Sequence, residues 1–195
     1  MLDQMRGVVC RMWEVAESLD NMGVGKLIPF ISDSSDVRHA MKGEMIIMLY
    51  DIVGTDKKLS REQVEYLRYV LHAPIKYSEQ EDYARWVRNE KTIRENPLTP
   101  YILMIDKETD MELAKVYLEL QASLAVGYLK CCGEIDVEMM IRYTRYMKRI
   151  QELIELSYGK KLDYNPLDFL DDEKRIQLSR SMNLHLNMQI RARGI

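Results

Sequence analysis

Four acidic residues stand at two similar bends of the chain, where carboxylates could hold a divalent cation. The first bend carries Asp56 and Glu62, and the second carries Asp136 and Glu138. Calcium takes about six to eight oxygen ligands, which is more than either bend supplies. Ser60 and Asp136 also have the residue type of helix N-caps, with the glutamates following as first-turn acids. We therefore expect cap chemistry and no bound metal at both bends, and keep a metal site as the alternative.

Histidine and cysteine give little support for catalysis. His39, His72 and His185 do not form a close pair, and the chain has no nucleophile elbow, P-loop or dinucleotide fingerprint. Cys131 and Cys132 end an apolar stretch, so we expect packed thiols there. We predict that the protein is not an enzyme and carries no cofactor. The alternative is an enzyme without a recognisable motif, in which Cys132 is redox-active.

Length and composition are those of an ordinary globular protein. The chain has 195 residues, of which 47% are hydrophobic, and 28 Lys+Arg against 31 Asp+Glu give a net charge of -3. This balance argues against a nucleic-acid partner, because phosphate contacts need a basic excess. The N-terminal segment lacks the apolar core of a signal peptide, and no apolar run approaches the roughly 20 residues of a membrane span, so no integral membrane segment is expected. We expect a cytoplasmic protein.

The elements that must position these residues are expected to be helices. Nine glycines and five prolines are too few for the many turns of an all-β domain. The predicted fold class is all-α, a bundle of about seven helices in residues 1–170, followed by a C-terminal helix and extended tail in residues 171–195. Apolar spacing and caps predict helices over residues 3–21, 36–53, 61–73, 78–94, 100–107, 110–131, 136–159 and 171–181.

Local residues are expected to cap these helices. Ser60 and Ser78 each begin a capping-box pattern, with a glutamine or glutamate three residues later. Ser35 or Asp36 is expected to cap the second helix, and Asp110 to cap the long helix that ends at residue 131.

Residues 56–63 read DKKLSREQ and residues 132–139 read CGEIDVEM, each between two expected helices. This layout resembles the pattern helix, D-G-x-I-[S/D]-x-E-E, helix of the TerB-like (tellurite-resistance B) family. The resemblance covers residues 30–158. Lys57 replaces the glycine of the pattern, Cys132 replaces its aspartate, and its last acid is absent from both segments.

The resemblance implies an α-helical domain without an established catalytic activity. TerB-like domains are linked to bacterial stress-response and phage-defence systems, usually as interaction modules. Some carry acidic clusters proposed to bind metal, which here would be Asp56, Glu62, Asp136 and Glu138. We therefore expect a non-catalytic protein-interaction or scaffold module. The alternative is a metal-responsive regulator that binds a divalent ion at the acidic bends.

A charged segment over residues 78–96 is the first candidate partner-binding region. It places Arg85, Trp86 and Arg88 within four positions, where they could be presented to an acidic partner protein. The competing interpretation is a solvated helix that Trp86 docks onto the bundle.

The C-terminal tail is the second candidate partner-binding region. Apolar and polar residues alternate strictly in it, which indicates a strand. Such a strand could pair with its copy in a homodimer or extend the sheet of a partner protein. The competing interpretation is an extended tail in an apolar groove. The apolar members of the alternation are Met182, Leu184, Leu186, Met188 and Ile190.

Overall fold

The protein is all-α over the part of the chain that its computed structural model describes. That part comprises residues 2–29, 31, 37–95, 97–131, 136–170, 175 and 180, and none of these residues lies in a strand. In chain order the helices, with two short 3-10 turns η1 and η2, are α1 (Leu2–Asn21), η1 (Val24–Leu27), α2 (Val37–Val53), α3 (Arg61–Leu71), η2 (Tyr77–Glu79), α4 (Gln80–Asn89), α5 (Thr92–Glu95), α6 (Leu98–Thr109), α7 (Leu113–Lys130) and α8 (Val137–Tyr158).

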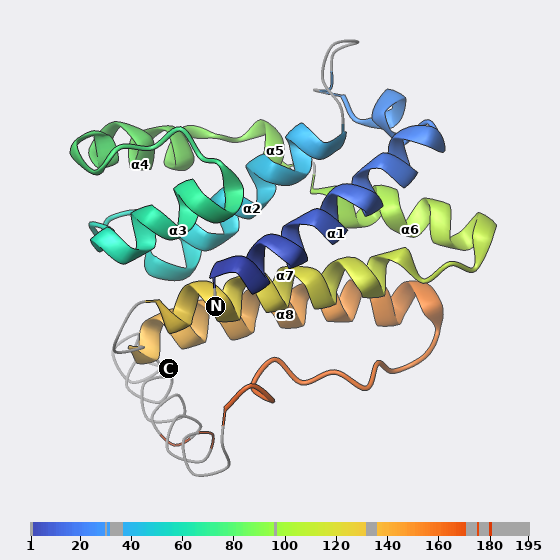
Figure 1. Cartoon of the computed structure of the whole chain (residues 1–195). Helices are drawn as coiled ribbons and strands as arrows, with labels where there is room; N and C mark the ends of the chain where they lie inside the picture. Colours follow the sequence, from blue (N-terminus) through green and yellow to red (C-terminus); the bar gives the residue numbers. More distant parts are fainter. Residues whose placement is uncertain are drawn as a thin grey trace, which may run out of the picture.

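The long helices pack around α7 and α2. Helix α1 lies against α7, α2 and α3, while α8 packs along both α7 and α2. Figure 1 shows α7 and α8 side by side, with α3 and α4 at one end of the molecule and α6 at the other. The apolar stripe predicted for the first helix is confirmed, since Met12, Ala16 and Leu19 are fully buried.

Two helices are capped at their N-terminus by a carboxylate from another helix. Asp20 of α1 accepts the Val37 N–H at 3.1 Å, where α2 begins. Glu44 of α2 accepts the Leu98 N–H at 2.9 Å, where α6 begins. The predicted start of α6 at Pro100 is therefore wrong by two residues. Pro100 lies in the first turn instead, where its missing N–H costs nothing.

The predicted cap of α7 by Asp110 is also wrong. Asp110 ends α6 in the left-handed conformation, and its N–H donates to the Asp106 carbonyl. The Asp106 carboxylate, buried within α6, accepts the N–H groups of Leu113 and Ala114 at 2.7 and 2.8 Å. Tyr158 of α8 donates its hydroxyl to the same carboxylate at 2.6 Å. One buried acid thus joins α6, α7 and α8.

The single helix predicted over residues 78–94 is divided in the structure. Ser78 lies in η2 and does not cap α4, whose N-terminus has no side-chain cap. Gln80 is instead bonded across the fold, because its side-chain oxygen accepts the Leu59 N–H at 2.8 Å. The guanidinium of Arg94 folds back from α5 and donates to the Val87 carbonyl at 3.1 Å.

The caps predicted at the two acidic bends are confirmed. Ser60 and Gln63 exchange both bonds of a capping box at the start of α3. The Asp136 carboxylate accepts the Met139 N–H at 2.6 Å at the start of α8. Gly159 ends α8 with a positive φ of 66°, as glycine readily does.

Several predictions concern residues outside the described part of the chain. These are the caps Ser35 and Asp36, almost all of the 171–181 helix, and the alternation from Met182 to Ile190. The expected count of about seven helices and the C-terminal strand are therefore not confirmed, whereas the all-α class is.

The caps of α7 give a first prediction. Asp106→Asn replaces one acceptor oxygen by an amide group that faces a backbone N–H, so the unfolding free energy should fall by about 2–3 kcal/mol. Asp110→Asn should change it by less than about 0.5 kcal/mol, because asparagine tolerates the left-handed conformation. Urea unfolding followed by circular dichroism measures both. If Asp110→Asn destabilised the protein more than Asp106→Asn, Asp110 would be the cap of α7.

Candidate functional site

The fold brings the two acidic bends together through a lysine. The Lys57 ammonium lies 3.1 Å from Asp136 Oδ2 and 3.2 Å from Glu138 Oε2. All three side chains are about half exposed, so solvent weakens the pairs. Lys57 holds the position that glycine has in the TerB-like pattern, and its cation binds the carboxylates that were candidate metal ligands.

Arg142 of α8 completes the junction between the bends. Its guanidinium lies 3.4 Å from Glu138 and donates to the carbonyls of Ile52 and Val53 at 2.8 and 2.7 Å. These carbonyls belong to the last turn of α2, where carbonyl groups have no hydrogen-bond partners within the helix. Gly54 follows with a φ of 104°, which favours glycine because it has no Cβ. The bend is thus closed by cations of the chain itself.

The four predicted metal ligands do not share one site. Asp136 and Glu138 bind the Lys57 ammonium, whereas Asp56 forms no hydrogen bond or ion pair with Lys57 in the described part of the chain and Glu62 lies in the first turn of α3. Among the described residues, no three His, Cys, Asp or Glu side chains are grouped to hold an ion. The two bends lie next to each other, and the Lys57 ammonium lies between them.

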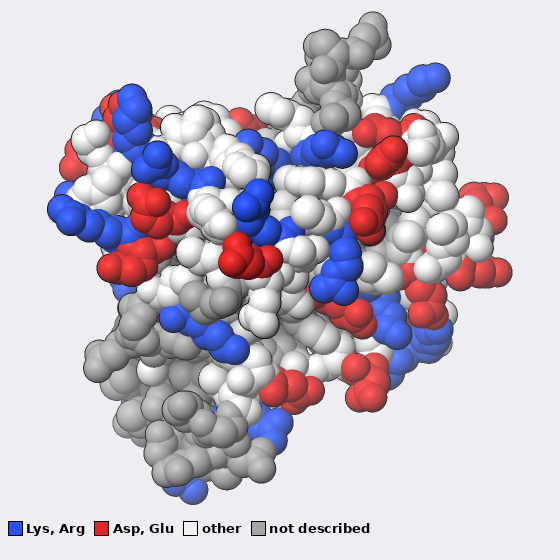
Figure 2. Space-filling view, in the orientation of Figure 1, with Lys and Arg blue, Asp and Glu red and all other residues white. Residues whose placement is uncertain are grey.

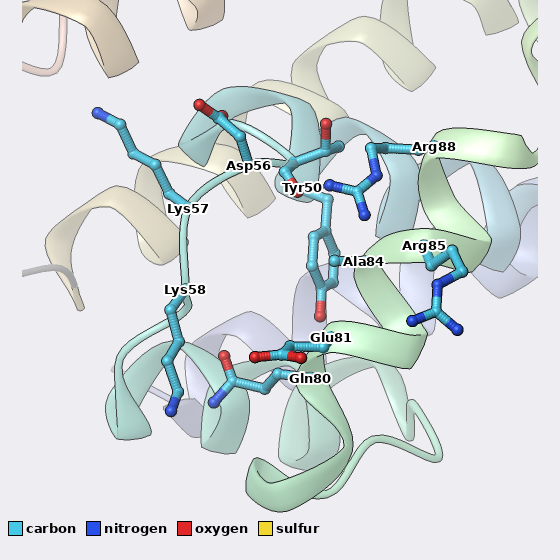
Figure 3. Close-up of a pocket in the computed structure, with 10 residues that line it drawn as sticks. Tyr50, Asp56, Lys57, Lys58, Gln80, Glu81, Ala84, Arg85 and Arg88 are labelled. Carbon is cyan, nitrogen blue, oxygen red and sulfur yellow. Dashed lines mark hydrogen bonds between the residues drawn. The ribbon is translucent and has the colours of Figure 1, made fainter.

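A pocket of about 310 Å³ lies between the loop after α2 and helix α4. We call it the Tyr50 pocket. Figure 3 shows Lys57 and Lys58 on the loop side, Arg85 and Arg88 on the α4 side, and the Tyr50 ring between them. Its lining residues are Tyr50, Thr55, Asp56, Lys57, Lys58, Gln80, Glu81, Ala84, Arg85 and Arg88.

Tyr50 carries the feature of this pocket that sequence reasoning missed. The side chain is 1% exposed, yet its hydroxyl has no hydrogen-bond partner among the described residues. Burial, followed by the neighbouring Tyr83, raises the pKa of Tyr50, so the hydroxyl stays neutral and able to donate. A buried polar group without a partner is costly. Among the described residues, Tyr50 shares this feature with Thr99, Thr144, Ser157 and Tyr164. Only tertiary contact reveals it.

The cations of the pocket are held by weak or local contacts. Arg85 pairs with Asp82 one turn earlier at 3.1 Å, and Arg88 donates to the Thr55 carbonyl at 3.1 Å. Lys58 lies over the ring of Tyr77, 5.2 Å from its centroid. These side chains are exposed and can exchange their present partners for an incoming anion at little cost.

The structure separates the three residues predicted on the charged segment. Arg85 and Arg88 line the Tyr50 pocket, but Trp86 does not. Trp86 is 39% exposed and stacks on Tyr83 with ring centroids 5.3 Å apart, so it docks α4 and still presents a face to solvent. Figure 2 shows cations and acids interspersed over the visible face of the molecule. The remaining predicted partner residues, in the C-terminal tail, lie outside the described part.

Comparisons with known proteins do not test the resemblance to the TerB-like family. No family model, no curated protein and no solved structure matches the chain. Within the described residues, no helix has the length and apolar character needed to cross a bilayer.

The lysine junction gives a second prediction, concerning two carboxyl groups. The Lys57 ammonium, followed by Arg142, lowers the pKa of Glu138. Burial opposes ionisation of Asp136, but the Met139 N–H and then Lys57 outweigh it and lower that pKa too. Lys57→Met should therefore raise the pKa of Glu138 more than that of Asp136, which keeps its backbone bond.

Carboxyl carbon NMR titration measures both groups. Because the folded pKa values are lowered, this junction stabilises the fold at neutral pH, and its contribution is lost as the pH falls through the acid range. An unchanged Glu138 titration in Lys57→Met would show that the ammonium does not bridge the bends in solution.

Proposed function

We propose that the protein is a non-catalytic interaction module that binds an acidic segment of a partner protein at the Tyr50 pocket. The observation that carries this proposal is the unpartnered, buried Tyr50 hydroxyl in a pocket lined by Lys58, Arg85 and Arg88. An incoming carboxylate accepts from that hydroxyl and pairs with the cations, so it supplies the missing bond.

Charge and shape favour an acidic peptide as the occupant. With the Lys57 ammonium paired to the two carboxylates of the second bend, the pocket lining keeps an excess of one positive charge. The charges that remain are three cations against two acids, namely Lys58, Arg85 and Arg88 against Asp56 and Glu81. The exposed Trp86 of α4 is adjacent to Arg85 in sequence, and the exposed ring of Tyr77 in η2 lies under Lys58. Arginine together with tyrosine and tryptophan is the composition of energetically important positions at protein interfaces. This combination supports a protein partner rather than a free ion.

The proposal keeps the cytoplasmic location expected from the sequence and the stress-response setting that the TerB-like resemblance implies. It differs from a metal-responsive regulator in the role of the bends. In the proposed module the bends are structural, and Lys57 holds them together so that the loop of residues 54–59 forms one wall of the pocket. Self-association through the Met182–Ile190 segment stays a separate prediction, which cross-linking of a chain lacking residues 182–195 would test.

A peptide-binding measurement tests the module. Fluorescein-labelled hexaglutamate should bind the full chain, and hexaglutamine should bind at least about tenfold more weakly, because only the former pairs with the cations. The double variant Arg85→Glu with Arg88→Glu should lose at least about tenfold in affinity, measured by fluorescence polarisation. Raising the salt concentration should weaken hexaglutamate binding, as it screens exposed charges.

Arg145→Glu provides the matched control. Arg145 is an exposed arginine on α8 outside the pocket. Arg145→Glu therefore changes the net charge of the protein by the same amount as Arg85→Glu. If Arg145→Glu lost as much affinity for hexaglutamate as Arg85→Glu, binding would depend only on the overall charge of the protein. That result would contradict binding at the Tyr50 pocket. Equal binding of hexaglutamate and hexaglutamine would contradict an acidic partner.

Tyr50→Phe separates the hydroxyl from the fold. The substitution removes an unpartnered hydroxyl and keeps the ring, so the unfolding free energy should stay the same or rise slightly. Hexaglutamate affinity should fall at least about tenfold, because one hydrogen bond to a charged group contributes about 1.5–3 kcal/mol. Unfolding in urea and polarisation measure the two effects. A marked loss of stability with full affinity would show that Tyr50 serves only the core.

A further inference from the structure

A second pocket, of about 210 Å³, opens between α2, α5, α6 and α8. It shares no lining residue with the Tyr50 pocket, so it goes beyond the proposed peptide site. Half of its lining residues are polar or charged, and the apolar half consists of Ile47, Met48, Ile93, Pro97, Ile150 and Leu153. We call it the Glu44 pocket, because the carboxylate of Glu44 lines it from within the core.

Glu44 is 5% exposed and is bonded by three elements. Its Oε2 accepts the Leu98 N–H at 2.9 Å, and its Oε1 accepts from Gln121 Nε2 at 3.3 Å and from the Tyr146 hydroxyl at 3.5 Å. The two bonds to Oε1 are long, and the neighbouring Tyr117 hydroxyl also acts on the carboxylate as a donor. A charged donor can replace the weakest of these bonds with a stronger, charge-assisted one.

The second polar group of the pocket is Thr99. It is 2% exposed, and its hydroxyl has no hydrogen-bond partner among the described residues. The capping role of Glu44 explains its bond to Leu98, but it explains neither this orphaned hydroxyl nor the space beside it. The pocket therefore holds one unpartnered hydroxyl and one buried carboxylate, to which an external donor can bond.

The other charges near Glu44 leave room for a cation. Asp51 of α2 and Arg94 of α5 are joined by two hydrogen bonds and neutralise each other. Arg149 of α8 is exposed at the pocket, where solvent screens it. The remaining titratable neighbours are the phenols of Tyr117 and Tyr146, whose pKa values burial, followed by Glu44, raises, so both stay neutral.

We propose that the Glu44 pocket binds a small organic amine. The ammonium group donates to the carboxylate of Glu44 and to the hydroxyl of Thr99, while an alkyl chain of a few carbons lies against Ile47, Ile150 and Leu153. The volume is below the roughly 300 Å³ at which drug-sized sites begin, so the ligand is small. Burial raises the pKa of Glu44 to about 7, and an ammonium binds its ionised form, so binding and proton release are coupled.

Three butyl compounds of matched length test this proposal on the full chain. Methyl NMR shifts of Ile47, Ile150 and Leu153 report binding of n-butylamine, 1-butanol and butyrate. At about pH 8, n-butylamine should bind at least about tenfold more tightly than either of the others. Between about pH 8 and about pH 6 its affinity should fall about tenfold, because Glu44 becomes protonated while the amine stays charged. Glu44→Gln should remove this pH dependence.

Leu153→Trp provides a second test of the proposal, which can be used if the Glu44→Gln variant does not fold. Leu153 lines the pocket and is 39% exposed, so tryptophan there should block it without touching Glu44. Leu156→Trp is the matched control, because Leu156 lies one turn later on α8, is 82% exposed and does not line the pocket. Loss of amine binding in Leu153→Trp alone supports the proposal. Equal binding of amine, alcohol and carboxylate, or no shift of these methyl signals with n-butylamine, overturns it.

Discussion

Buried helix ends impose the constraint on which this fold depends. The first N–H groups and the last carbonyls of a helix have no partner within it, and in a closely packed bundle water reaches few of them. The structure satisfies them with side chains from other helices: Asp20 caps α2, Glu44 caps α6, and Asp106 caps α7. Arg142 does the same for the last carbonyls of α2. Each such bond joins two helices, so the same hydrogen bonds that cap the helix ends also fix how the helices pack.

The same constraint accounts for the chemistry at the acidic bends. At the second bend, Asp136 caps α8 and binds Lys57 together with Glu138, so the negative charge of these two residues is compensated within the chain. This arrangement stabilises the loop between α2 and α3, and that loop forms one wall of the Tyr50 pocket. The feature of the sequence that most resembled a metal site therefore positions a different site next to it.

Both candidate sites lie where the satisfaction of polar groups is incomplete. Tyr50 and Thr99 are buried with free hydroxyls among the described residues, and each lines a pocket that contains charged groups. Helix α2 supplies both pockets, with Tyr50 in one and Glu44 in the other. Other buried side chains of the described part, such as Thr144 and Tyr164, also have hydroxyls without a partner, so what distinguishes Tyr50 and Thr99 from these is that each also lines a pocket with charged groups.

Periodicity and local caps determined the all-α class, the extents of α1, α2 and α8, and the caps at Ser60 and Asp136, because these depend on residues a few positions apart. Arg85 and Arg88 were also found from their local density of charge. The sequence did not determine the cap of α7 by Asp106, the division of the 78–94 helix, or the pockets of Tyr50 and Glu44. The Glu44 carboxylate, for example, is bonded by residues 54 to 102 positions away, and only tertiary packing decides which residues reach it.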